Sequence, residues 1–212
     1  MIAAILWDHD GVLVDTERLY FQATRDVLAG AGVELTVAAY RRLFLTESRG
    51  AWHLAAERGI APEEIERLRA LRNDRYREML TNGDVLIPGA LDLLERMKSR
   101  YRMAVVTSSH REHFDAIHSR TRLRDLVEFV VTPDDYTHYK PHPEPYLLAL
   151  AKLGLPAADC IAIEDSERGL QSARAAGIRC CIIRTELTEG CAFDGAERCF
   201  ASLAEVGEFL LA

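Results

Sequence analysis

The sequence has few cysteines, no long apolar run and no excess of positive charge. Its 212 residues include 5 cysteines and no C-x-x-C spacing, so neither a zinc site nor a disulfide framework is predicted. No apolar run approaches the roughly 18 residues that span a bilayer, and Asp8 comes too early for a signal peptide. With 26 Lys and Arg against 33 Asp and Glu, the net charge of −7 disfavours nucleic-acid binding. We therefore expect a cytoplasmic protein with no nucleic-acid or membrane partner.

Nucleotide-binding glycine loops are also missing. No G-x-x-x-x-G-K pattern occurs, and Gly30-Ala31-Gly32 lacks the third glycine of a dinucleotide loop. What the chain does have is material for a core, because 49% of its residues are hydrophobic and 28% are charged. Its length is about 1.4 times a typical ~150-residue domain, which allows one domain that carries an insert.

Short apolar runs indicate strands that are buried on both faces, as in a parallel sheet. These runs are Ile2–Trp7, Met103–Val106, Val127–Val131, Cys160–Ile163 and Cys180–Ile183. Helical patterns lie between the later runs, at Gly89–Arg100, Pro145–Leu153 and Glu167–Ala176. The alternation predicts an α/β fold with a doubly wound, Rossmann-like parallel sheet.

One long stretch after the first strand departs from this alternation. Leu19–Leu28, Ala51–Arg58 and Glu63–Leu80 all carry apolar residues at helical spacing, and no convincing strand lies among them. We therefore predict that residues 17–84 form a helical cap domain. It would be inserted into a catalytic core made of residues 1–16 and 85–212.

Polar, reactive residues follow four of the predicted strands. They are Asp8-His9-Asp10-Gly11, Thr107-Ser108-Ser109, the segment from Asp134-Asp135 to Lys140-Pro141, and Glu164-Asp165-Ser166. A single member could be a helix cap or a turn residue. Ligands of open α/β sheets, however, bind outside the carboxyl ends of the strands. The coincidence of four such segments predicts a binding or catalytic site there.

These residue types suit phosphoryl transfer. Carboxylate oxygens are typical Mg²⁺ ligands, and a cation together with Lys140 would keep Asp8 ionised for attack on phosphorus. Asp10 would share the side of Asp8 if the strand period continued, and it could carry the proton for the leaving oxygen. Thr107 and the Ser108 amide would hold phosphate oxygens, while Lys140 would offset charge in the transition state. The same alternation would turn His9 away from both acids, as a packing or hydrogen-bonding residue.

The segment from Asp8 to Glu17 resembles the first motif of the haloacid dehalogenase superfamily. Thr107, Lys140–Tyr146 and Glu164-Asp165-Ser166 resemble its second, third and fourth motifs, in the right order. The match is most similar to the branch of β-phosphoglucomutase, phosphoglycolate phosphatase and sugar-phosphate phosphatases, which have a helical cap after the first motif. The dehalogenases of the superfamily lack the second acid, so Asp10 favours phosphoryl transfer.

The resemblance implies a role for each matching residue. Asp8 would be the nucleophile and Asp10 the general acid and base. Mg²⁺ would be bound by Asp8, the main-chain carbonyl of Asp10 and Asp165, with Glu164 beside the metal. Thr16, in the first motif, would contact substrate.

Two cap arginines are candidate substrate-binding residues. Arg49 and Arg72 match cationic cap positions of the mutase-like branch, and a guanidinium suits bidentate phosphate contact. Either could instead lie on a solvated helix face. The mutases carry a His near the start of the cap where this chain has Tyr20, which favours a phosphatase over a mutase.

The sequence therefore predicts a monomeric, Mg²⁺-dependent phosphatase of small phosphorylated metabolites that forms an aspartyl-phosphate. A β-phosphoglucomutase-like sugar-phosphate mutase is the alternative. A phospho-acceptor domain or a non-catalytic binding protein is less favoured, because phospho-acceptor domains are shorter and lack a large helical insert.

Overall fold

The computed structural model describes residues 2–47, 49–82, 85–119 and 121–212. The chain forms two compact units. Unit 1 consists of Met1–Asp15 and Leu86–Ala212, and unit 2 consists of Thr16–Val85. Two short connections, near residues 15 and 86, therefore join an inserted segment to a unit built from both ends of the chain.

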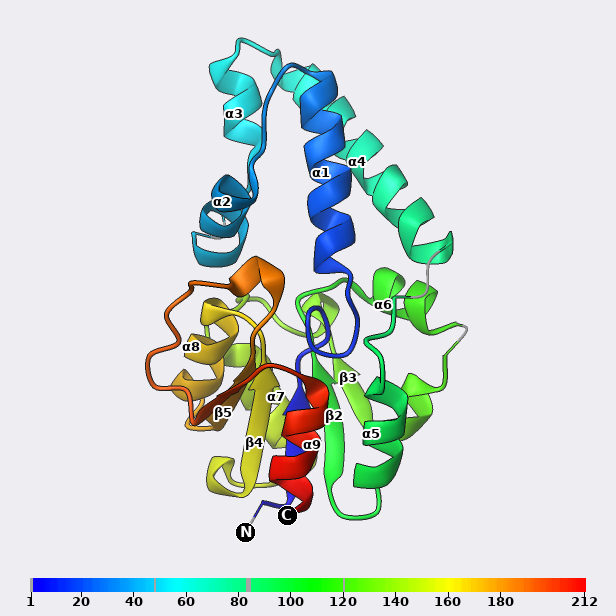
Figure 1. The fold of residues 1–212 in the computed structure, drawn as a ribbon, viewed down its shortest axis with the longest axis vertical. Helices are drawn as coiled ribbons and strands as arrows, with labels where there is room; N and C mark the ends of the chain where they lie inside the picture. Colours follow the sequence, from blue (N-terminus) through cyan, green and yellow to red (C-terminus); the bar gives the residue numbers. More distant parts are fainter. Residues whose placement is uncertain (1, 48, 83–84, 120) are drawn as a thin grey trace. The chain divides into compact units, whose positions relative to one another are not determined.

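Unit 1 contains a six-stranded parallel sheet in the order β3-β2-β1-β4-β5-β6 (Figure 1). The strands are β1 (Ala4–Trp7), β2 (Arg102–Val106), β3 (Phe129–Val131), β4 (Cys160–Glu164), β5 (Arg179–Ile183) and β6 (Arg198–Phe200). The order reverses direction at β1, which pairs with β2 on one side and β4 on the other. This is the doubly wound topology, so the predicted fold class is confirmed.

Helices cover both faces of the sheet. Successive side chains of β1 point to opposite faces, and every residue of β1 is buried. Ile5 and Trp7 belong to one apolar cluster, which includes residues of α5 (Ala90–Met97), α6 (Arg111–His118) and α9 (Leu203–Leu211). Ala4 and Leu6 belong to the other cluster, with residues of α7 (Glu144–Leu153) and α8 (Glu167–Ala175). Short 3₁₀ helices lie at Leu123–Leu126, Pro133–Asp135, Ala157–Asp159 and Glu186–Thr188.

One strand and two α-helices of the described part of unit 1 lie outside the strands and helices predicted from the sequence. Strand β6 is a short edge strand in which Arg198 and Cys199 are exposed, so it has no apolar run to detect. Helix α6 offers only Phe114 and Ile117 as buried apolar residues over its eight positions. Helix α9 covers the last residues of the chain, where the sequence analysis names no element.

Unit 2 is helical throughout its secondary structure. It contains α1 (Glu17–Gly30), α2 (Val37–Tyr40), a π-helix (Arg41–Thr46), α3 (Trp52–Glu57) and α4 (Pro62–Asn82). None of its described residues, 16–47, 49–82 and 85, lies in a strand. The π-helix region was not predicted. It is fixed to α1 by aromatic contacts, because Tyr40 lies 4.9 Å from Phe21 and 4.4 Å from Phe44 between ring centroids.

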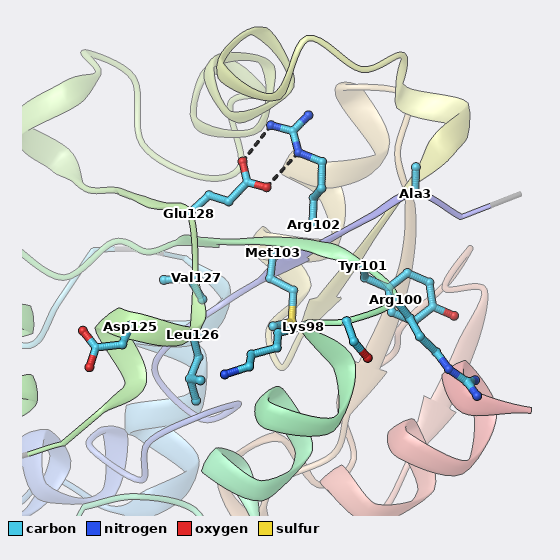
Figure 2. A pocket seen from close by; sticks show the side chains of 11 residues that line it. Ala3, Lys98, Arg100, Tyr101, Arg102, Met103, Asp125, Leu126, Val127 and Glu128 are labelled. Carbon is cyan, nitrogen blue, oxygen red and sulfur yellow. Dashed lines mark hydrogen bonds and ion pairs between the residues drawn. The ribbon is translucent and has the colours of Figure 1, made fainter.

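A surface cavity of about 620 Å³ lies at the amino ends of the strands of unit 1 (Figure 2). The ion pair between Arg102 and Glu128 lines it, with nitrogen–oxygen distances of 2.8 and 2.7 Å. Ala3, Arg102 and Glu128 all precede or begin strands, so this cavity is at the edge opposite to the strand-end segments singled out from the sequence. No helix in the described part of the chain is long and apolar enough to cross a membrane.

Candidate active site

The first strand end forms a tight turn that carries two acids. Asp8 follows β1 directly, and its backbone N–H donates to the Ile163 carbonyl at 2.8 Å. The backbone N–H groups of Leu13 and Val14 both donate to the His9 carbonyl, at 2.9 and 3.1 Å. The strand period therefore stops at Trp7, and it is this turn that sets the position of Asp10.

Two glycines of the site allow a carboxylate to approach the backbone closely. Gly11 has φ +84°, and a Cβ there would collide with the Asp165 carboxylate. Gly169, in the first turn of α8, lies against Glu164, and a Cβ there would overlap the Glu164 carboxyl group. Both acids are thus held at distances that a larger residue at either position would forbid.

Lys140 is the centre of the buried part of the site. Its ammonium donates to Asp8 Oδ1 at 2.6 Å, to Glu164 Oε1 at 2.7 Å and to the Val106 carbonyl at 2.7 Å. Its side chain is only 2% exposed. Burial opposes the charge, but Asp8 and Glu164 together outweigh burial and raise the pKa of Lys140 above its usual value. Lys140 is therefore a fixed cation that joins the ends of β1, β2 and β4.

Tyr146 of α7 was not singled out from the sequence, although it belongs to the third motif. Its hydroxyl donates to Glu164 Oε1 at 2.7 Å, and its ring centroid lies 5.1 Å from the Lys140 ammonium. Since the ring is fully buried, Tyr146 holds both members of the Lys140–Glu164 pair from the helix side.

Three carboxylates of this site could hold a metal ion. Oxygen atoms of Asp8, Glu164 and Asp165 lie within 4.8 Å of one another, and all three residues are buried. Burial, followed by the charge of Glu164, raises the pKa of Asp8 to about 8, although the Lys140 ammonium opposes this shift. Lys140 supplies one positive charge to the two carboxyl groups it contacts, Asp8 and Glu164. An oxygen-only donor set fits Mg²⁺.

A second group of polar residues surrounds Asp10. Asp10 Oδ2 accepts from the Ser109 hydroxyl at 2.8 Å and from the Thr107 hydroxyl at 3.2 Å, and the Ser109 N–H donates to Thr107 Oγ1 at 2.9 Å. The sequence pattern predicts Ser108 as a site residue, whereas the hydroxyl that reaches Asp10 is that of Ser109. The position of Ser109 two residues after Thr107 was the sequence signal that could have indicated this contact.

His9 does not turn away from both acids. Its Nδ1 lies 3.3 Å from Asp10 Oδ2, so that expectation is wrong. The reason is that the alternation of side chains ends with β1 at Trp7, before His9 is reached. His9 is fully buried and hydrogen-bonded, in agreement with its expected packing role.

The segment before α7 presents Lys140 from a turn organised by Glu144. The Glu144 carboxylate accepts from the backbone N–H groups of Thr137 and His138, both at 2.9 Å, and from His138 Nδ1 at 2.6 Å. The Thr137 N–H and the His138 side chain lower the pKa of Glu144 to about 2. Glu144 was not predicted as a structural residue of the site.

Replacing Glu144 with Gln tests this turn. The folded-state pKa of Glu144 is lower than its usual value of 4.5, so its ionised form stabilises the fold above about pH 4.5 and this contribution is lost as the pH falls toward 2. We expect Glu144→Gln to lower the free energy of unfolding at pH 7 and to have less effect at pH 3, measured by urea denaturation. Equal destabilisation at both pH values would contradict a charge-dependent role.

The predicted substrate-binding residues of unit 2 lie in different environments. Thr16 is buried and is the N-cap residue of α1, and Arg49 is exposed. Arg72 is buried, with its guanidinium centre 4.3 Å from the Tyr20 ring centroid and 5.5 Å from that of Trp52. These contacts give Arg72 a packing role within unit 2. Substrate contact by any of these side chains stays a prediction.

Comparison with known proteins identifies the family. A family model described as "Haloacid dehalogenase-like hydrolase" matches residues 5–183. The chain belongs to this family. Protein CbbY of Rhodobacter capsulatus is 36% identical over 92% of this chain and 91% of its own length. A phosphorylated carbohydrates phosphatase of Thermotoga maritima is 31% identical over 82% of each chain.

A solved structure agrees with this assignment. A CbbY variant from Rhodobacter sphaeroides in complex with xylulose-(1,5)bisphosphate superposes with a TM-score of 0.78, at 30% identity, over 98% of this chain and 97% of that one. The predicted haloacid dehalogenase resemblance is therefore confirmed. The four strand-end segments that carried it lie within the described part of unit 1 and meet at the carboxyl edge of its sheet.

Proposed function

We propose that this haloacid dehalogenase-like hydrolase is a Mg²⁺-dependent phosphatase of small phosphorylated metabolites, and that it acts through an aspartyl-phosphate on Asp8. The observation that carries the proposal is the buried Lys140 ammonium, which holds Asp8 and Glu164 at 2.6 and 2.7 Å. The relatives support the substrate class, because one is a phosphorylated carbohydrates phosphatase and another was solved with a sugar bisphosphate.

The two half-reactions would use the two acids differently. An oxygen of Asp8 attacks phosphorus while the bond from phosphorus to the leaving oxygen breaks, and Asp10 gives that oxygen its proton. Asp10 then takes a proton from water as the water attacks phosphorus, so that Asp8 is released together with inorganic phosphate. Lys140 holds Asp8 in place, and Thr107 with the Ser108 amide would receive phosphoryl oxygens.

A magnesium ion fits the oxygen-rich edge of this cluster. Asp8, Asp165 and the main-chain carbonyl of Asp10 would hold it, with Glu164 beside it. Side-chain oxygens of Asp8, Glu164 and Asp165 lie within 4.8 Å of one another. When bound, Mg²⁺ would supply positive charge that offsets the charge of the phosphoryl oxygens. Its charge would also oppose the burial and the Glu164 charge that raise the pKa of Asp8.

Unit 1 would then be the catalytic core and unit 2 the cap, close to the predicted division into residues 1–16 with 85–212 and residues 17–84. Arg49 is our candidate for contact with a second anionic group of the substrate, because its side chain is exposed. Arg72 is the weaker candidate, since aromatic rings cover it. A monomeric state and a cytoplasmic location stay predictions from the sequence.

Phosphate release from a panel of sugar phosphates, sugar bisphosphates and phosphoglycolate tests the function. We expect turnover with Mg²⁺ and none after removal of divalent metal with a chelator, with recovery when Mg²⁺ is restored. A parallel assay follows interconversion of glucose phosphate isomers. Activity that persists in chelator would contradict the metal assignment, and isomerisation without free phosphate would replace the phosphatase by a mutase.

A further inference from the structure

A buried chain of side chains extends from Asp10 away from the cluster of Lys140. His9 Nε2 lies 2.7 Å from His118 Nε2, and His118 Nδ1 lies 2.6 Å from the Thr121 hydroxyl. His9 is fully buried and His118 is 7% exposed. At the other end, His9 Nδ1 lies 3.3 Å from Asp10 Oδ2. Four polar groups are therefore linked in series by three short contacts, and neither the metal cluster nor the phosphate-binding residues use His118 or Thr121.

The ring packing holds this chain in place. The Phe114 ring lies 4.9 Å from His9 and 4.4 Å from His118 between centroids, and the two histidine rings are 5.0 Å apart. Phe114 and His118 both belong to α6, so one helix supplies the apolar wall and the second histidine. Buried imidazoles at hydrogen-bond distance need complementary hydrogens, because two N–H groups or two lone pairs cannot face each other favourably.

The hydrogens of the chain can be assigned from its two ends. Burial, followed by the His9 ring, lowers the pKa of His118 to about 3, so His118 is neutral at physiological pH and has one N–H. If that N–H were on Nδ1, His9 Nε2 would have to be the donor. With its single hydrogen on Nε2, the His9 ring would then direct the lone pair of Nδ1 at the Asp10 carboxylate. The opposite assignment satisfies every contact, because Thr121 donates to His118, His118 to His9, and His9 to Asp10.

We propose that His118 and Thr121 are positioning residues for Asp10: they fix the Nδ1–H tautomer of His9, which donates to Asp10 Oδ2. In the structure, Asp10 Oδ2 has three donors, namely the hydroxyls of Thr107 and Ser109 and the His9 ring. The Ser109 hydroxyl and the His9 ring stay as donors when the single Thr107 hydroxyl hydrogen turns to a phosphoryl oxygen. They anchor one oxygen of the carboxylate that must deliver and collect a proton, and this limits its rotation. Two of the three donors follow β2. The third, the His9 ring, follows β1, and its tautomer is set by His118 of α6 and by Thr121.

Nitrogen chemical shifts test the tautomers without any assay of activity. In a long-range ¹H–¹⁵N spectrum of the wild-type protein at neutral pH, we expect His9 to be protonated at Nδ1 and His118 at Nε2. His118→Phe keeps an aromatic ring beside Phe114 but removes the donor, so the His9 Nδ1–H signal pattern should be lost or become mixed. His9 protonated at both nitrogens, or at Nε2 alone in the wild type, would overturn the proposal.

The catalytic consequence rests on the proposed acid and base role of Asp10. Loss of one hydrogen bond worth about 0.5–1.5 kcal/mol corresponds to a roughly 2- to 13-fold lower kcat. We expect His118→Phe to show this loss with an alkyl phosphate and little change in KM. In a single turnover with 4-nitrophenyl phosphate, whose leaving group needs no proton, release of nitrophenolate should be slowed less. Because His118→Asn can still donate an N–H, it should recover most of the activity.

Matched variants distinguish the effect of these hydrogen bonds on Asp10 from a general effect on folding. His113→Phe changes another histidine of α6, which is not part of the hydrogen-bonded series from Asp10 to Thr121. It should leave both the tautomers and kcat unchanged. Thr121→Val should lower kcat for the alkyl phosphate and Thr121→Ser should not. Equal slowing of leaving-group release from both substrates in a single turnover, or no rescue by Asn and Ser, would overturn the positioning role. If the wild type released no phosphate, the proposed function would fail, whereas the tautomer result would still stand or fall by itself.

Discussion

Asp8→Asn is expected to abolish phosphate release, because an amide oxygen cannot form the aspartyl-phosphate. The replacement keeps the shape of a side chain that is 10% exposed and leaves Lys140 its contacts to Glu164 and Val106. Acid quenching of the wild-type protein during turnover should trap a phosphorylated chain that mass spectrometry locates at Asp8. The variant should show neither turnover nor the trapped species. Substantial residual activity would remove Asp8 from the role of nucleophile.

The same variant should be more stable than the wild type when no metal is bound. Asp8 has a pKa of about 8 in the folded protein against an ordinary value of 3.8, so the folded state binds more protons than the unfolded state between these pH values. Wild-type stability in chelator should therefore fall as the pH rises from about 4 to 8. Asn at this position does not titrate, and this decline should be absent from its urea denaturation series. Asp115→Asn, an exposed carboxylate of α6, is the matched control and should behave as the wild type.

Asp10→Asn should lower kcat by about 10²–10⁴-fold for alkyl phosphates, which is the usual contribution of general acid–base catalysis. An amide can still accept from Ser109 and Thr107, so the local hydrogen bonds are largely kept. Stopped-flow and steady-state measurements on the same substrates would give kcat and KM separately. We expect the effect to fall mainly on kcat.

A comparison of leaving groups shows whether Asp10 acts as an acid, a base or both. With 4-nitrophenyl phosphate the first half-reaction needs no proton, so Asp10→Asn should give a burst of nitrophenolate followed by slow hydrolysis and a build-up of phosphorylated protein. The wild type should show no such accumulation under the same conditions. Identical losses for alkyl and aryl phosphates, with no burst, would argue against proton transfer by this residue.

The sequence predicted well the parts of the protein that depend on burial and on strand order. Parallel strands buried on both faces, such as β1 and β4, are continuous apolar runs, and their ends lead directly to Asp8 and Glu164. Side-chain direction was predicted less well where a strand ends. The contact of His9 with Asp10 depends on a turn whose backbone N–H groups converge on the His9 carbonyl, and no periodicity reports such a turn.

Contacts between distant segments were a second limit. Ser109 is separated from Asp10 by 99 positions and His118 from His9 by 109, and only the folded sheet brings them together. Glu144 was missed for another reason: its partners are backbone N–H groups six and seven positions earlier, so any acid in that part of the sequence would have looked equally plausible. Residue type alone does not tell a structural acid from a catalytic one.

The absence of a side chain at Gly169 has a consequence for attempts to make this protein more heat-resistant. A glycine within a helix usually costs about 0.5–1 kcal/mol relative to alanine, so helical glycines are common targets of consensus engineering. At Gly169 that exchange would press a methyl group onto the Glu164 carboxyl, which Lys140 and Tyr146 already hold. Directed evolution for thermal tolerance should thus leave this codon untouched, since here a more rigid helix and an intact site are incompatible.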